Sequence, residues 1–255
     1  MKDPASYIEF LKGDIPLVIS VPHGGKLDVD EIPRRIKGFL GIDGETIEFS
    51  RELIDFIKNF YEKNNINGKS PSYVMSKVAR SRIDLNREES EAFIQHSKLA
   101  KQIYRFFHDR IKETVINNLE IYERSILIDL HGFEKANRPP GFRDVDIILG
   151  TNNLESFYSS KIPKKEWGNN LRGRIVQKFT ELNIPIAPSN PQRREYVLTG
   201  GYITKTYGAS QIPNSQVIQI ELSDKIRIQD LELRKEVQYA LATIFVEELQ
   251  NIKRI

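Results

Sequence analysis

The sequence of 255 residues contains no cysteine. This absence excludes disulfide bonds, thiolate metal ligands and a cysteine nucleophile, and it favours a cytoplasmic location, where disulfides are rare. No apolar run approaches the roughly 20 residues of a membrane-spanning helix. The first residues also lack an apolar segment ahead of a small-residue cleavage site. We therefore expect a cytoplasmic protein with no signal peptide and no membrane partner.

Long runs of one charge are missing as well. Lysine and arginine number 38 and aspartate and glutamate 35, and no stretch holds five consecutive basic residues. Nucleic-acid-binding proteins gather positive charge on one face, so we expect no nucleic-acid partner. No repeat and no Pro/Gly/Ser-rich linker divides the chain. We expect residues 1–255 to form a single domain, and the pattern leaves the oligomeric state open.

Short β-branched runs alternate with longer segments whose apolar residues recur at helical spacing. The expected strands are 15–22, 73–85, 125–130, 145–151 and 216–222. The expected helices are 45–64, about 88–120, 169–183 and 230–252. This alternation predicts an α/β fold with a mixed, mostly parallel sheet that helices cover on both faces. In such sheets, reactive groups gather just beyond the carboxyl ends of the strands.

Four of the apolar segments end in polar residues, namely His23, Asn86-Arg87, His131 and Glu221. One such ending would be weak evidence of a site, because most histidines in proteins are structural. Four in one chain indicate a functional site. No Gly-x-Ser-x-Gly motif is present, so nothing indicates a serine nucleophile on a strand-to-helix turn.

The chain has four histidines, and two of them are suited to share a ligand. His96 and His108 fall in one expected helix about 120° apart around its axis, so they cannot hold a metal on one face. His23 and His131 end different strands and precede glycines, which would let a ligand approach closely. Neighbouring strands would let these two imidazoles hold one divalent cation. Asp129 lies on the same strand face as His131 and would orient its ring.

An ordered set of motifs resembles the N-formylglutamate amidohydrolase family. The motifs are SVPHGG, R-x-x-x-D-L-N-R, DLHG, GGYITKTYG and QIEL, and the resemblance runs from about Ile15 to Ser223. The segment DVDIILGT also looks like that family's mid-chain strand. The resemblance implies a single α/β domain of the phosphorylase/hydrolase-like type, similar in fold to zinc carboxypeptidases and to the aspartoacylase and succinylglutamate desuccinylase group. It also implies one catalytic zinc ion per chain.

Carried over by residue, the resemblance makes His23 and His131 zinc ligands. Lys26 stands where the carboxypeptidase pattern His-x-x-Glu would place an acid. In the family that this chain resembles, the acidic ligand comes some twenty residues later, which here means Asp43 or Glu45. The local pattern Asp-x-x-Thr favours Asp43, although either residue would also suit a helix start. Two histidines and one carboxylate with an open position form a known catalytic zinc site.

The resemblance assigns further roles at the strand ends. Glu221 would be the general base that assists a zinc-activated water, and Arg80 would stabilise the oxyanion. Asn86 and Arg87 would bind the substrate carboxylate. Asp84 would support these arginines. The alternatives are that Glu221 is a salt-bridged strand residue and that the arginines form a structural network.

Period-two geometry in the expected strand 73–85 would place one more arginine, Arg82, on the face of Arg80, Asp84 and Asn86. Gly200 and Gly201 would let backbone amides approach the ligand beside Tyr202. The family carries histidine where Tyr202 stands and a basic residue just before the glycines, where this chain has Leu198-Thr199. Lys205 retains a basic position. These departures leave the exact acyl amino acid open.

The resemblance therefore implies a zinc-dependent amidohydrolase that removes an N-acyl group from an acidic amino acid, a small-molecule substrate. N-formyl-L-glutamate, cleaved to formate and L-glutamate as in histidine degradation, is the first candidate. One alternative is a zinc carboxypeptidase or another amidohydrolase of N-acyl amino acids or peptides. Another is a metal-free protein that binds carboxylates through Arg87.

Overall fold

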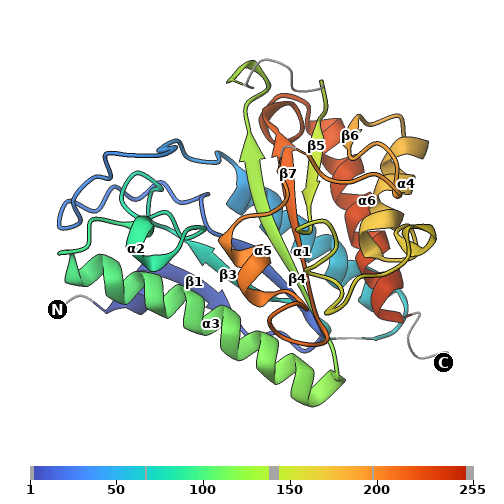
Figure 1. The fold of residues 1–255 in the computed structure, drawn as a ribbon, viewed down its shortest axis with the longest axis horizontal. Helices are drawn as coiled ribbons and strands as arrows, with labels where there is room; N and C mark the ends of the chain where they lie inside the picture. Colours follow the sequence, from blue (N-terminus) through green and yellow to red (C-terminus); the bar gives the residue numbers. More distant parts are fainter. Residues whose placement is uncertain (1–2, 67, 138–143, 197, 251–255) are drawn as a thin grey trace.

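Seven strands form one mixed sheet in the computed structural model, which describes residues 3–66, 68–137, 144–196 and 198–250 (Figure 1). In spatial order they are β1 (Ile8–Leu11), β3 (Ser72–Ser76), β2 (Leu17–Val21), β4 (Ser125–Phe133), β7 (Ser215–Ser223), β5 (Ile147–Gly150) and β6 (Ile186–Ala187). The four central strands β3, β2, β4 and β7 are mutually parallel. β1 and β5 run antiparallel to their inner neighbours β3 and β7. The expected mixed, mostly parallel sheet is confirmed.

Helices cover both faces of the sheet, as Figure 1 shows. On one face lie α2 (Glu89–Ala92), α3 (Lys98–Tyr122) and α5 (Tyr202–Tyr207). On the other lie α1 (Thr46–Lys63), α4 (Leu171–Glu181) and α6 (Leu231–Gln250). Short helical turns lie at Pro4–Tyr7, Lys135–Asn137, Lys164–Glu166 and, as a π-helix, at Lys225–Gln229. Among the residues described, no helix combines the length and apolar character needed to cross a membrane.

The alternation of side chains along the strands divides the core into two layers. In β2, Leu17 and Ile19 pack into the layer under α1 and α6, whereas Val18 packs into the layer under α3. The buried face of α3 includes Ile103 and Phe107, at the predicted helical spacing. Each such side chain contributes roughly 1.5–3 kcal/mol when it is fully buried. The sheet is therefore rigid on both faces, and its carboxyl edge stays free for polar groups.

The structure corrects several element boundaries. The strand expected over 73–85 ends at Ser76, because its pairing with β1 and β2 ends there and an isolated bridge between Leu27 and Val78 follows. The helix expected over 88–120 is two helices, and Ser97 starts the second by accepting a hydrogen bond from the amide of Ala100. The short elements β1, β6 and α5 were not expected. Residues 251–252 of the last predicted helix lie outside the described residues.

Candidate functional site

Strand order alone brings the two predicted histidines together. β2 and β4 are parallel neighbours with Ser20 opposite Asp129, so the residues that follow them emerge at one edge of the sheet. His131 lies within β4, and its partner on β7 is Glu221. Asp43 arrives from the loop before α1, and its amide donates to the carbonyl of His23 at 3.0 Å. Four groups from separate parts of the sequence thus share the carboxyl edge of the central strands.

His23, Asp43 and His131 form a buried cluster, which we call the histidine cluster. One ligand atom from each lies within 4.8 Å of the others. The two Nδ1 atoms are 3.2 Å apart, and Asp43 Oδ2 lies 3.2 Å from Nδ1 of His131 and 3.6 Å from Nδ1 of His23. Buried lone pairs that face one another are costly unless a proton or a cation lies between them. Two imidazoles and a carboxylate match the ligands of catalytic zinc.

Two further carboxylates fix the orientation of the imidazoles. Nε2 of His23 donates to Asp84 Oδ1 at 2.7 Å, and Nε2 of His131 donates to Asp129 Oδ2 at 2.9 Å. Because a carboxylate only accepts, each Nε2 carries a proton, and in the neutral imidazole each Nδ1 then offers a lone pair to the centre of the cluster. Carboxylates hold metal-binding histidines in this way in known sites. The structure thus places Asp129 against His131, as the sequence predicted, and Asp84 in the matching position at His23.

Electrostatics inside the cluster favour a cation. Burial raises the pKa of Asp43, but hydrogen bonds with His131 and His23 outweigh burial and hold that pKa below its ordinary value. Burial lowers the pKa of His131, but Asp129, Asp43 and Glu221 outweigh burial and raise it well above the usual range. Without a metal, an imidazole therefore keeps a proton between these groups. A divalent cation can take the place of that proton.

Glu45, the other candidate for the third ligand, turns away from the histidines. Its carboxylate accepts a hydrogen bond from Lys26 at 2.9 Å, and it is about one-third exposed. Its backbone is left-handed at φ 61° just before α1 begins. The structure thus brings Asp43 to the histidines and leaves Glu45 at the surface.

Asp84 connects the cluster to three arginines. Its Oδ2 lies 3.1 Å from Nε of Arg80, 3.5 Å from a terminal nitrogen of Arg35 and 3.8 Å from Nε of Arg87. Burial raises its pKa, but His23, Arg80 and Arg35 hold that pKa below the ordinary value. The sequence predicted that Asp84 supports arginines. It did not predict the contact with Arg35, because Arg35 lies in a loop of mixed composition that carries no recognisable pattern.

Arg80 reaches into the cluster, whereas Arg82 does not. A terminal nitrogen of Arg80 lies 3.8 Å from Asp43 Oδ1, and its guanidinium lies over the ring of Phe39 at 5.1 Å. Arg82 instead pairs with Asp28 and donates to a backbone carbonyl of the 28–32 loop. The predicted common face of Arg80 and Arg82 is wrong, because β3 ends at Ser76 and these residues lie in turns.

Asn86 and Arg87 are adjacent but lie in different surroundings. Asn86 is buried; its Oδ1 accepts from the amide of Ile203 at 2.9 Å, and its Nδ2 lies 3.4 Å from Asp129 Oδ2. Arg87 is 53% exposed, with Asp84 as its charged neighbour. The polar atoms of Asn86 already contact other protein groups, whereas the guanidinium of Arg87 is accessible to a ligand.

The glycines of the motifs make room mainly for protein atoms. A Cβ on Gly201 would lie 2.3 Å from the amide group of Asn86, and one on Gly132 would lie 2.3 Å from the guanidinium carbon of Arg227. Gly200 has the left-handed backbone, with φ +112°. Tyr202 lies with its ring edge-on to His108 at 5.5 Å, in the layer under α3. The expectation that glycines beside the histidines admit a ligand is therefore wrong for Gly132, and also for Gly24, where a Cβ would lie 2.5 Å from Oγ1 of Thr46.

Glu221 stands across the strand pair from His131. Nε2 of Gln219 donates to Glu221 Oε1 at 2.7 Å, and Gln219 Oε1 accepts from the amide of Gly201 at 2.6 Å. Burial raises the pKa of Glu221, and the neighbouring His131 opposes that rise. A carboxyl group whose pKa is raised above its ordinary value is suited to proton transfer.

Arg227 joins the three segments that carry the site, and sequence patterns did not reveal it. It lies in the π-helix and is 1% exposed. Its guanidinium donates to the carbonyls of Gly44, Leu222 and Phe133, which lie one or two residues from Asp43, Glu221 and His131. Short π-helical segments are frequent at functional sites. Arg227 therefore fixes the positions of Asp43, His131 and Glu221 relative to one another.

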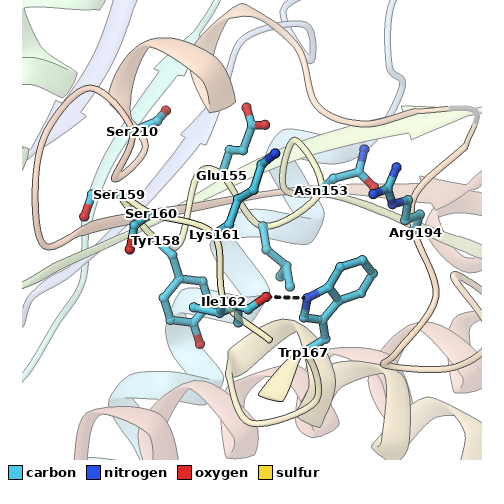
Figure 2. A pocket seen from close by; sticks show the side chains of 11 residues that line it. Asn153, Glu155, Tyr158, Ser159, Ser160, Lys161, Ile162, Trp167, Arg194 and Ser210 are labelled. Atoms are coloured by element: carbon cyan, nitrogen blue, oxygen red, sulfur yellow. Dashed lines mark hydrogen bonds between the residues drawn. The ribbon is translucent and has the colours of Figure 1, made fainter. Parts of the chain in front are cut away.

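A pocket lies beyond the end of β5, and none of the residues that line it belongs to the histidine cluster (Figure 2). Trp167 and Tyr158 form one wall, and Nε1 of Trp167 donates to the carbonyl of Ile162 at 3.3 Å. Arg194 and Asn153 line its other side. The residues predicted for the site lie elsewhere.

Two solved structures share this architecture. An N-formylglutamate amidohydrolase from Ralstonia eutropha JMP134 has a TM-score of 0.69 and 13% identity, covering 97% of this chain and 98% of that one. A gene product of Agrobacterium tumefaciens has a TM-score of 0.55 and 14% identity, covering 96% of this chain and 94% of that one. Neither the protein-family models nor the curated proteins give a match to the sequence. The likeness shows the fold, which is the fold that the motifs led us to expect.

Proposed function

We propose that this protein is a zinc-dependent amidohydrolase that removes an N-acyl group from an acidic amino acid, with N-formyl-L-glutamate as the first candidate substrate. The observation that carries the proposal is the histidine cluster, in which three buried ligand groups converge and Glu221 lies opposite His131. The structural neighbour from Ralstonia eutropha is described as an N-formylglutamate amidohydrolase, which agrees with this proposal.

His23, Asp43 and His131 would hold the metal ion. Their fit rests on the geometry of the cluster itself, since both Nδ1 atoms and Asp43 Oδ2 lie within 3.6 Å of one another. When bound there, zinc polarises the amide carbonyl and makes a water molecule more acidic. Asp84 and Asp129 would keep both imidazoles in the tautomer that binds metal.

The side chains around the cluster would carry out the remaining steps. Arg87 would bind the substrate carboxylate through its planar fork, and Arg80 would stabilise negative charge on the carbonyl oxygen. Glu221 would take a proton from the attacking water and return it to the leaving nitrogen. The new C–O bond forms first, and the C–N bond breaks when the carbonyl is restored and the nitrogen takes up the proton, so that water and the N-acyl amino acid give a carboxylate and an ammonium group.

Two variants assayed together test the proposal. His131→Ala should lose the metal and about a thousandfold or more of the activity, because a ligand and the orientation of the others are lost. Glu221→Gln should retain the metal and lose about 10²–10⁴-fold of the activity. Metal content by elemental analysis and formate release from N-formylglutamate are the measurements. Full metal occupancy in His131→Ala would falsify the ligand assignment.

The same experiment separates the alternatives. A zinc carboxypeptidase would release amino acids from blocked peptides without releasing formate. A carboxylate-binding protein would hold no metal and stay inactive after zinc is supplied.

A further inference from the structure

A pocket of about 560 Å³ opens beside Arg87, outside the histidine cluster. The loop 35–38 forms one side of it and residues 90–95 form the other. None of the three ligand residues lines it, but Arg87 lines it and lies 3.8 Å from Asp84, the carboxylate that accepts from His23. Its size falls in the range of roughly 300–1,000 Å³ that is typical of pockets for small organic ligands. The pocket therefore has room for part of a ligand that extends beyond Arg87.

The charges lining this pocket are mostly positive. The lining holds three cations, Arg35, Lys37 and Arg87, and one acidic residue, Glu91. Lys37 forms no hydrogen bond or ion pair with any residue that the structure describes. Beneath the pocket, the single carboxylate of Asp84 serves Arg35, Arg87 and also Arg80. Arg35 is buried and Lys37 and Arg87 are exposed, and three cations against one carboxylate in the lining give this pocket a positive potential that favours an anionic ligand.

Arg35 makes the pocket a built site rather than a group of surface cations. It is 7% exposed, and its NH1 donates to the carbonyls of Phe39 and Arg80 at 3.2 Å each. These bonds hold the loop 35–39 against the segment that carries Arg80. Phe93 and Ile94 supply an apolar wall opposite the cations. An acidic side chain has both a methylene stem for this wall and a carboxylate for the cations.

We infer that the enzyme acts on N-acylated acidic peptides: Arg87 binds the carboxylate of the first acidic residue, and the second acidic residue binds in the adjoining pocket beside Lys37 and Arg35. This inference rests on the proposed amidohydrolase function and extends its substrate class from one acidic amino acid to at least two in sequence. Water adds to the acyl carbon, the bond to the peptide nitrogen breaks, and formate and a free dipeptide result. Arg87 lies on the path between the cluster and the pocket because it contacts Asp84 and lines the pocket as well.

Kinetics on matched substrates test the inference. The substrates are N-formyl-Glu, N-formyl-Glu-Glu and the neutral extension N-formyl-Glu-Ala. We expect kcat/KM to be about tenfold higher for N-formyl-Glu-Glu than for N-formyl-Glu-Ala, the value of one charge-assisted hydrogen bond. Lys37→Gln should remove most of that ratio. Lys58→Gln is the matched control: Lys58 lies at an exposed position of α1, so this variant should keep the ratio. Equal rates on both dipeptides in the wild type would overturn the inference.

A binding measurement on the metal-free protein separates this inference from the proposed function. Titration calorimetry with L-glutamyl-L-glutamate and L-glutamate needs no catalysis. We expect the dipeptide to bind at least tenfold more tightly, and Lys37→Gln to reduce this preference while Lys58→Gln does not. If no substrate releases formate but this preference persists, the function fails and the acidic-peptide site stands. If formate is released but the dipeptide has no advantage, the inference fails alone.

Discussion

Two arginines of this protein are almost completely buried, and their surroundings differ. Arg172 in α4 lies at one edge of the sheet, with its Nε 2.9 Å from the buried carboxylate of Glu195. Arg227 lies beside the histidine cluster, and its three hydrogen bonds all go to backbone carbonyls. Both side chains are 1% exposed, and burial lowers the pKa of both.

The difference lies in where each positive charge is balanced. At Arg172 the balance is local, because Glu195 is its direct partner and also accepts from the amides of Thr151 and Asn153. At Arg227 the charge acts on Asp43, Asp224 and Glu221 without a direct bond. The ion pair of Arg172 and Glu195 neutralises both charges and holds a loop in place. Arg227 bonds only to carbonyls, so its positive charge still attracts the carboxylates of the site. Burial of a charge is therefore not in itself a sign of function.

The largest effect should follow from breaking the Arg227 contacts. Arg227→Met leaves one buried and two partly buried carbonyls without this donor, at about 1–3 kcal/mol each, so we expect a loss of roughly 5 kcal/mol in the free energy of unfolding. Metal affinity should fall as well, because Asp43 and His131 lose their common support. Urea unfolding and metal titration measure the two effects. Wild-type metal affinity in a folded Arg227→Met protein would contradict the positioning role.

Breaking the pair at the other arginine should affect stability alone. Glu195→Ala leaves Arg172 buried without its counter-charge, and we expect a loss of about 3–5 kcal/mol in the free energy of unfolding. The double variant Arg172→Met/Glu195→Leu should recover part of that loss, since no unpaired charge remains. Metal content should stay at the wild-type level in both variants. A change in metal content in Glu195→Ala would contradict the claim that the pair of Arg172 and Glu195 affects stability alone.

His108 extends the comparison from the two buried arginines to a buried histidine whose hydrogen-bond partner is a hydroxyl group. Burial lowers its pKa to about 4, and Nδ1 lies 2.9 Å from the hydroxyl of Tyr207. The unfolded chain takes up this proton from about pH 6.5 downward, so stability is present above that pH and is lost as the pH falls toward 4. Through this group the wild type should lose about 2 kcal/mol between pH 7 and pH 5.

Denaturant unfolding of His108→Gln at the two pH values measures this slope. The difference in stability between the wild type and the variant should shrink by about 2 kcal/mol on going to pH 5. The matched control is His96→Gln, because His96 is exposed. A difference between the wild type and His108→Gln that is the same at both pH values would show that burial does not govern the protonation of His108.

The smallest effect is expected at Glu45. Its pair with Lys26 lies at the surface, where such pairs contribute about 0–1 kcal/mol. Glu45→Gln should therefore keep metal content and change the free energy of unfolding by less than about 1 kcal/mol, whereas Asp43→Asn should lose the metal. Metal analysis of the two variants decides the third ligand. Loss of metal in Glu45→Gln alone would reverse the assignment made from the geometry.

Strand periodicity and turn chemistry made much of the framework predictable. The apolar runs that became β2, β4, β5 and β7 and the helical spacing in α1 and α3 follow from side-chain periods that the chain carries locally. The short elements β1, β6 and α5 were missed because two to six residues give too little pattern. The end of β3 was missed because a strand stops where its neighbours stop, which local sequence does not record.

By itself the sequence determined the fold class and the residue types of the site, because apolar periodicity and polar strand endings are local properties. Only the tertiary structure decided which of Asp43 and Glu45 meets the histidines, and that Asp84 serves His23 as well as arginines. It alone placed Arg35 and Arg227, since a buried guanidinium is stabilised by carbonyls and carboxylates from distant segments. Those contacts depend on strand order, and strand order is a property of the whole chain.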